Sequence, residues 1–458
     1  MRTRRRHIWN EIRATFWFVP GLMVVAAALG AGVTTILDAA LVAADLPDWV
    51  YAGDADGARA LLSTVAGSMV TVAGVGFSIT IVALVLASTQ FGPRLLTLFM
   101  RDVTSQLTLG AFAGTFTFCV LILRTIRSDG ATVFVPQIGI TVGIALTLVS
   151  VGALVYFFHH VAVSIQAPRL VAAVARDLDA AIDHLYPGDF GQGGAEPPPE
   201  DVPDRHHDGV VVAARSGYVQ VVDDAELMAI AGERDICIRL VTRPGLFVVE
   251  GNPIVIVRPP ERVDAATIDR LRAGLIIGDV RTAEDDIEFS VRQLVEVALR
   301  ALSPAINDPF TAMASVDWLG AALARLARTE WPSRYRYDSS GRLRVVADIS
   351  TFGGLAHTIF SRIRHYGGTS PVVLNRLLET VTAFGPHVAT EADRDLVRDE
   401  IEAVRRTART HLTSEADLQE LEKRYRAALE ALGSAAAGLA RSATEGGTSD
   451  PGSMATQR

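Results

Sequence analysis

The chain has 458 residues, of which 49% are hydrophobic, and its formal net charge at pH 7 is −8. This acidic balance argues against nucleic acid as a partner, because proteins that bind DNA or RNA usually carry a basic surface. Lys423 is the single lysine, so the chain lacks the Gly-Lys-Ser/Thr sequence of a Walker-type phosphate loop. Cys119 and Cys237 are the two cysteines, and neither has a second thiol near it in sequence for a metal site.

Long apolar segments occupy the first third of the chain, at about 16–44, 63–90, 107–123 and 134–158. A helix needs about 20 apolar residues to cross the hydrocarbon layer of a bilayer. The second and fourth segments contain no charged residue, whereas a surface helix of a soluble protein keeps a polar face toward water. Residues 1–167 are therefore predicted to form four transmembrane helices in contact with the lipid bilayer.

Charges beside these segments predict their orientation. Residues 2–6 contain a cluster of arginines, residues 45–56 are acidic, and residues 93–101 bring basic charge back. Basic loops stay in the cytoplasm, so both termini are placed there. Two arginines in the loop 124–130 run against this rule. A cleaved signal peptide over residues 1–32 is the competing interpretation, which the uninterrupted apolar run disfavours.

The second apolar segment is rich in small residues. Pairs of small residues four apart let helix backbones approach closely in lipid, which predicts packing within the bundle or in a homo-oligomer. The alternative is a hydroxyl-bearing face that lines a pore. The candidates for either role are Gly67, Ser68, Thr71, Gly74 and Ser78.

Asp38 is the ionisable candidate inside the membrane part, near the outer end of the first segment. We interpret it as an interfacial carboxylate that reaches headgroup water. Acidic or histidine residues at mid-membrane usually mark proton relays. Their absence from these segments argues against a proton-coupled transporter.

The soluble region is predicted to be mixed α+β. Residues 168–208 read as a helix followed by a flexible Pro/Gly-rich linker, and residues 209–260 as a small β-rich module. The glycine-containing runs at 214–219 and 243–253 resemble the barrel-sandwich hybrid of biotinyl and lipoyl carriers. The module has no lysine to modify, so a carrier role is excluded.

Most of the remaining soluble chain is predicted to be helical. Residues 261–440 form a helical bundle with one β-hairpin at 335–346, whose turn is 338–341. Residues 441–458 are polar and glycine-rich, which predicts a disordered tail.

A dense polar constellation lies between residues 279 and 308. Carboxylate and amide oxygens of this kind suit Mg²⁺ or Ca²⁺, but the spacing of an EF-hand loop is missing. The favoured interpretation is helix capping combined with a structural network of ion pairs. An inter-subunit contact is a third possibility, and no metal or cofactor is predicted. The members are Arg281, Asp285, Asp286, Arg292, Asn307 and Asp308.

Two motifs carry a family resemblance. One is the run 77–95 that closes the second apolar segment, and the other combines 286–295 with 301–312. Together they resemble a family of bacterial predicted membrane proteins that is defined by a domain of unknown function. The resemblance implies a bundle of four N-terminal transmembrane helices in a bacterial plasma (inner) membrane, with a cytoplasmic C-terminal region, and it brings no activity.

Catalytic signatures such as Gly-x-Ser-x-Gly and His-Glu-x-x-His are absent, so we expect no enzyme. The expected function is an oligomeric channel-like or transport-related pore with a cytoplasmic regulatory domain. The alternative is a non-catalytic membrane scaffold or sensor, whose cytoplasmic helices bind a protein partner that the sequence does not identify.

Overall fold

The computed structural model describes residues 15–41, 47–92, 102–127, 134–164, 166–185, 202–204, 208–282, 286–329 and 331–445. The chain divides into two compact units, Met1–Arg169 and Leu170–Arg458. The predicted linker over 187–201 lies outside the described residues.

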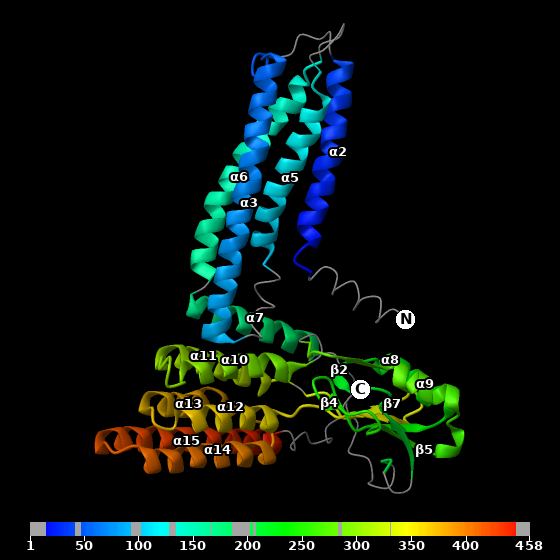
Figure 1. The fold of residues 1–458 in the computed structure, drawn as a ribbon. Helices are drawn as coiled ribbons and strands as arrows, with labels where there is room; N and C mark the ends of the chain where they lie inside the picture. The colour runs from blue at the N-terminus through cyan, green and yellow to red at the C-terminus, as the bar shows by residue number, and fades with distance from the viewer. Residues whose placement is uncertain are drawn as a thin grey trace, which may run out of the picture. The chain divides into compact units, whose positions relative to one another are not determined.

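The N-terminal unit is a bundle of long apolar helices (Figure 1). Four helices of the described part are long and apolar enough to cross a membrane, which confirms the predicted transmembrane region. They are α2 (Phe18–Ala40), α3 (Ala55–Phe91), α5 (Val103–Thr125) and α6 (Gln137–Ser164).

Helix α5 occupies the centre of this bundle, where it packs against α2, α3 and α6. Half of its most apolar stretch is buried, compared with 17% for α2 and for α3 and 22% for α6. Thr115 of α5 and Ser150 of α6 share a buried hydrogen bond of 2.9 Å, so their hydroxyls are satisfied within the bundle. The middle of the bundle is therefore filled by side chains.

Asp38 caps a helix, and our prediction of an interfacial carboxylate in headgroup water is wrong. Asp38 is only 5% exposed, and its two carboxylate oxygens accept hydrogen bonds from the backbone N–H groups of Ile138 (2.8 Å) and Gly139 (2.9 Å). These N–H groups lie in the first turn of α6, where a negative charge complements the helix dipole. Asp38 thus ties the end of α2 to the start of α6.

The C-terminal unit begins with most of α7 (Ala167–Leu185) and continues into an α/β part. One sheet has five strands in the order β1-β5-β3-β8-β7, and the other has three in the order β4-β2-β6. Neighbouring strands are antiparallel except for the parallel pair β3 and β8. The strands are β1 (Gly209–Val212), β2 (Gly217–Val222), β3 (Cys237–Leu240), β4 (Phe247–Val248), β5 (Pro253–Arg258), β6 (Leu275–Gly278), β7 (Tyr335–Tyr337) and β8 (Leu343–Val346).

Strand β5, which lies between β1 and β3, contains the apolar run Ile254–Val257, which is buried throughout. Such a run is typical of a strand covered on both faces. The sheets take three strands from beyond residue 260, and helices α8 (Asp224–Arg234) and α9 (Ala265–Ala273) pack with them. The short η3 (Pro260–Arg262) follows β5 in the chain. The folded β-containing part therefore draws on more of the chain than 209–260.

The rest of this unit is a stack of helices, which confirms the predicted helical region (Figure 1). Helices α10, α12 and α14 contact one another in series, beside a second series of α11, α13 and α15. Large side chains such as Phe360 and Phe384 fill the core. The helices are α10 (Ile287–Ala301), α11 (Pro309–Leu326), α12 (Phe352–Gly367), α13 (Pro371–Phe384), η4 (Gly385–His387), α14 (Glu391–His411) and α15 (Glu415–Glu445).

The predicted β-hairpin is present, whereas the predicted C-terminal tail begins in a helix. The expected hairpin turn is present, since the Gly341 N–H donates to the Asp338 carbonyl at 2.9 Å and Gly341 has a φ of 76°. Helix α15 runs to Glu445, so residues 441–445 are helical where a disordered tail was predicted. Residues 446–458 lie outside the described part.

Candidate functional site

The small residues of α3 lie on the face of the helix that points away from the bundle. All five predicted positions are exposed in the single chain, and a Cβ added at Gly67 or Gly74 would meet no atom within 4 Å. The opposite face of α3 is buried, through residues such as Leu62, Ala66 and Ala83. Packing of the small-residue face within its own bundle is therefore ruled out for the described residues. The exposed face consists of Gly67, Ser68, Thr71, Gly74 and Ser78.

Hydroxyl groups on this face bond to the backbone of their own helix. Ser68 donates to the Thr64 carbonyl at 2.7 Å, and Ser78 donates to the Gly74 carbonyl at 2.9 Å. Thr71 donates to the Gly67 carbonyl at 3.1 Å. These bonds satisfy each hydroxyl proton in an apolar medium and leave the oxygen lone pairs able to accept a further bond.

In the C-terminal unit, Arg281 and Asp286 form a nearly buried ion pair. The Arg281 Nε and Nη2 atoms both donate to Asp286 Oδ2, at 2.8 and 2.5 Å, and the two side chains are 10% and 3% exposed. Asp286 Oδ1 accepts from the Phe289 N–H at 3.1 Å and thereby caps α10. Burial raises the pKa of the Asp286 carboxyl above its ordinary value, although the charge of Arg281 opposes this shift.

Gly245 lies directly against this pair. Its φ is 86°, a left-handed conformation that favours glycine. A Cβ at this position would overlap both the Asp286 carboxyl and the Arg281 guanidinium. The turn after β3 can therefore approach the pair this closely only because residue 245 has no side chain.

A second ion-pair cluster adjoins the same helix and is centred on Glu288. Arg243 donates to Glu288 Oε1 at 2.7 Å and to Asp348 Oδ2 at 2.9 Å. Arg292 and Ser350 also donate to Glu288, at 3.0 and 3.1 Å. Burial alone would raise the pKa of Glu288, but the hydrogen bond and charge of Arg243 hold it below its ordinary value. We call these groups, with Arg281 and Asp286, the α10 network.

The structure divides the predicted polar constellation into separate places. Arg281, Asp286 and Arg292 belong to the α10 network, and Asp285 lies outside the described residues. Asp308 caps α11 instead, where it accepts from the N–H groups of Phe310 and Thr311 at 3.1 Å each, and Asn307 precedes it with a φ of 48°. Among the residues described, no three His, Cys, Asp or Glu side chains gather as metal ligands.

Sequence reasoning missed Arg243, Glu288 and Asp348. Arg243 and Asp348 are 105 residues apart in the chain, so spacing alone gave no reason to join them. Glu288 had a signal, because it stands two residues after the helix cap Asp286 and four before Arg292, the spacing of an intrahelical ion pair.

The α10 network borders a cleft of about 530 Å³ within the C-terminal unit. Its lining includes Arg243, Asp286 and Asp348 together with the ends of β2 and β3. Buried polar groups without a hydrogen bond occur both near the cleft and in the helical stack. In the described part of the unit they include the Thr242 and Thr282 hydroxyls, the Ser290 hydroxyl and the Arg292 Nε. Of these groups, Thr242 belongs to the lining of the cleft.

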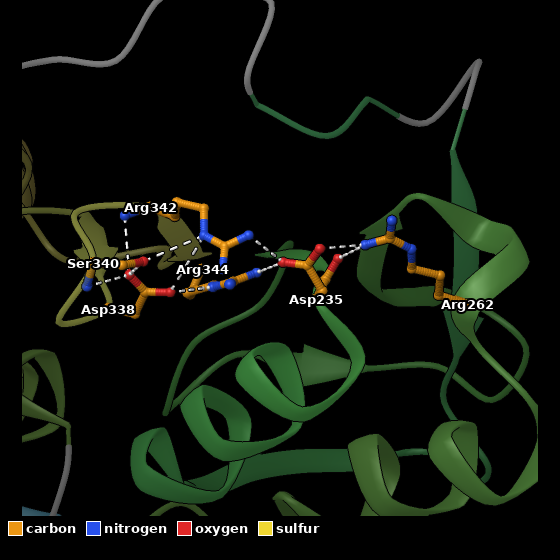
Figure 2. Close-up of polar contacts among 6 residues, drawn as sticks. All are labelled: Asp235, Arg262, Asp338, Ser340, Arg342 and Arg344. Carbon is orange, nitrogen blue, oxygen red and sulfur yellow. Dashed lines mark hydrogen bonds and ion pairs between the residues drawn. The ribbon is translucent and has the colours of Figure 1, made fainter.

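A third polar cluster fastens the β7–β8 hairpin to α8. Figure 2 shows Asp235, at the C-terminal end of α8, between Arg262 on one side and Arg342 and Arg344 on the other. Asp235 accepts from these arginines at 2.6 to 2.8 Å, and the largely buried Arg344 also donates to Asp338 at 2.7 Å. Hydrogen bonds from Ser340 and Arg344 hold the pKa of Asp338 well below its ordinary value. Two carboxylates bind three arginines from different segments here, which is the arrangement of a structural clamp.

Taken together, the apolar bundle and the folded C-terminal unit define a multi-pass membrane protein with a substantial soluble region. The chain belongs to the family described as "Predicted membrane protein (DUF2254)", whose family model matches residues 13–383. Both motifs that suggested the resemblance lie inside this match.

Curated relatives are similar over most of their length. The uncharacterized proteins Rv1290c of Mycobacterium tuberculosis and Mb1321c of Mycobacterium bovis are each 33% identical to this chain over 425 residues. The matched region covers 91% of this chain and 80% of each relative. No solved structure matches the chain significantly.

Proposed function

We propose that this protein is a homo-oligomeric, channel-like protein of the bacterial plasma membrane, in which α3 of each subunit faces the other subunits. The observation that carries the proposal is the exposed small-residue face of α3. Between Gly67 and Ser78 this face extends for about 16 Å along the helix, roughly half of the hydrocarbon thickness. Small residues spaced in this way permit close contact between helices in lipid.

The filled centre of the bundle supports a path between subunits rather than through one subunit. Helix α5 occupies the position where an internal path would run, and its side chains there are buried. Hydroxyl oxygens on α3 retain acceptor capacity toward a passing ion or water. A ring of subunits would bring these oxygens together around one axis.

Charge distribution supports a cytoplasmic location for both termini and hence for the C-terminal unit. In this proposal the C-terminal unit is regulatory and non-catalytic. A membrane-bound sensor or scaffold is the second candidate, and the cleft beside the α10 network favours it.

Recording of single-channel currents tests the proposal. The full chain, with Cys119 and Cys237 replaced by alanine, is reconstituted in planar bilayers as Ser78→Cys or as Leu148→Cys. Leu148 of α6 is 69% exposed and serves as the matched position on another helix. A positively charged thiol reagent should reduce the current of Ser78→Cys by more than half and leave Leu148→Cys unchanged. Bilayers that stay silent under both voltage and tension, or equal effects at the two positions, would refute the channel.

A further inference from the structure

The cleft in the C-terminal unit has the size of a small-molecule site. Its volume of about 530 Å³ falls within the range of about 300 to 1,000 Å³ that is usual for such sites. Apolar walls come from Leu185, Val222, Leu240, Ile287 and Ile349. The cleft therefore combines an apolar body with a few polar groups, as ligand pockets generally do.

The surface of the cleft is acidic. Its lining includes four carboxylates but only two guanidinium groups, those of Arg243 and Arg336. The arginines that pair with Asp183 and Asp286 are Arg325 and Arg281, and neither belongs to the lining. The cleft thus presents the carboxylate side of these ion pairs, which favours a positively charged ligand. The four lining carboxylates are Asp183, Asp224, Asp286 and Asp348.

Asp224 is the carboxylate that is available to a ligand. The other three each accept a hydrogen bond from an arginine, whereas no described residue donates a hydrogen bond to the Asp224 side chain. Surrounding protein raises the pKa of Asp224, while the positive charge of Arg336 opposes the shift. Asp224 is reached by solvent yet enclosed by the walls of the cleft, so a bound cation would replace water beside it.

Thr242 is a second, independent indication of a ligand. The residue lines the cleft and is only 2% exposed, and its hydroxyl has no hydrogen-bond partner in the described part of the chain. A buried hydroxyl without a partner costs free energy. A polar group on a bound molecule would remove that cost.

We propose that this cleft binds a small organic cation, with an ammonium group that donates to Asp224 and an apolar body that lies against Val222, Leu240 and Ile287. The Thr242 hydroxyl makes the second polar contact. Binding at this site does not depend on the number of subunits or on ion conduction, so it stands or falls separately from the proposed channel.

Fluorescence titration of the full chain in lipid nanodiscs tests the site with a matched pair of probes. Dansylcadaverine carries an ammonium group and an apolar ring system, and its N-acetyl derivative has the same body without the charge. The cationic probe should bind saturably and at least tenfold more tightly than the neutral one. Asp224→Asn should remove this preference by weakening the cationic probe about tenfold, without affecting the neutral probe.

Two further variants separate the site from indirect effects. Asp269→Asn changes an aspartate of α9 whose side chain is 78% exposed and which is not part of the lining, so binding should be unchanged. Ala347→Trp places a large side chain at a buried lining position and should abolish saturable binding of the cationic probe. Hydrogen exchange of α8 and α10 checks that each variant is folded. If Asp224→Asn does not fold, Thr242→Val takes its place. Thr242→Val should bind the cationic probe at least threefold more weakly than the natural chain.

Several results would overturn the inference. Equal affinity for the two probes would show that charge is not recognised. Unchanged binding by folded Asp224→Asn or by Ala347→Trp would place the probe elsewhere, including in the lipid. Tighter binding of an anionic probe such as dansylglycine would make the cleft an anion site of Arg243 and Arg336. Absence of saturable binding by the cationic probe would also contradict the proposal.

Discussion

At the scale of single residues, two positions allow contacts between segments that lie far apart in the chain. Asp38 joins α2 to α6 across 100 residues, and Gly245 admits the turn after β3 to the Arg281–Asp286 pair. Both contacts depend on the identity of one residue, so single substitutions test them.

Replacement of Asp38 by alanine should destabilise the N-terminal unit. The substitution removes the acceptor of two N–H groups and the negative charge at the start of α6, which together contribute about 1 to 2 kcal/mol. The thermal midpoint in detergent should fall by about 2 to 8 °C. Asp48→Ala is the control, because Asp48 is exposed and lies outside the helices, and its midpoint should not change. Equal midpoints for both variants would mean that Asp38 is not a stabilising cap.

Substitution of Gly245 by alanine should be more damaging than the same change at Gly251. Both glycines have φ near 80°, at 86° and 81°, so the backbone cost is shared. Only at Gly245 would the new Cβ overlap a neighbouring ion pair, whereas at Gly251 it would meet nothing within 4 Å. The difference should be about 1 to 3 kcal/mol. Hydrogen exchange at the Phe289 amide, which Asp286 caps, should rise in Gly245→Ala alone, and equal exchange in both variants would contradict this close packing.

Some of these contacts between residues could be predicted from the sequence. Arg281 and Asp286 are five positions apart, so their pairing could be predicted from the local pattern of charge. Arg243 and Asp348 could not be joined in that way, because the pairing of β3 with β8 brings them together. Asp38 was placed correctly near a helix end, but its carboxylate was predicted to contact headgroup water. The sequence does not say which helix begins beside Asp38.

At the scale of helices and strands, α10 is the element on which the soluble unit depends most. Its first turn receives the Arg281–Asp286 cap, and Glu288 then connects the turn after β3, through Arg243, with the segment after β8, through Ser350. These contacts make α10 the connection between the sheets and the helical stack.

Loss of the Glu288 charge should therefore weaken this connection in a pH-dependent way. Because the pKa of Glu288 is lower in the folded protein than its ordinary value of 4.5, its ionised form stabilises the fold above about pH 4.5. That contribution is lost as the pH falls through the folded pKa. Glu288→Gln should increase hydrogen exchange of α10 at pH 7, and the difference from the natural chain should shrink below pH 4.5.

Glu250→Gln provides the matched control for this experiment. Glu250 is exposed, and its side chain has no hydrogen bond in the described structure. Exchange of α10 in this variant should equal that of the natural chain at every pH. A Glu288→Gln difference that does not shrink as the pH falls below 4.5 would show that packing, and not charge, accounts for the effect.

At the scale of elements, sequence pattern predicted the helical region and the β-rich module in which β1 to β5 lie, because hydrophobic periodicity reports local structure. Helix α8 was missed although it had a signal. Asp223 caps it by accepting from the Glu226 N–H at 3.1 Å, with Glu226 three positions later as in a capping box. The parallel pairing of β3 with β8 had no local signal, since it joins strands about one hundred residues apart.

At the scale of the whole molecule, an exposed face of small residues in lipid is the feature that remains without an intramolecular role. Packing against lipid chains does not require glycine at positions 67 and 74, whereas a second helix can approach closely at Gly67 and Gly74. Length and hydropathy were sufficient to predict four spanning helices. They could not tell which face of α3 points outward, because that depends on how the helices pack around α5.

A bulky side chain on this face should separate the subunits. Gly74→Leu introduces a side chain where the single chain leaves open space, so the fold of each subunit should be unaffected. Contact between neighbouring α3 helices should be lost, and chemical crosslinking in native membranes should fall at least tenfold. Gly152→Leu on α6 is the control, because it is also a glycine with no atom within 4 Å, and its crosslinking should match that of the natural chain.

The central claim is that α3 joins copies of this chain into a ring, and the mass of the intact complex in lipid nanodiscs tests it most directly. Native mass spectrometry of the full chain should give one closed assembly of three or more subunits, which Gly74→Leu converts to monomers and Gly152→Leu leaves intact. A monomeric natural chain, or an assembly that Gly74→Leu does not change, would contradict the account.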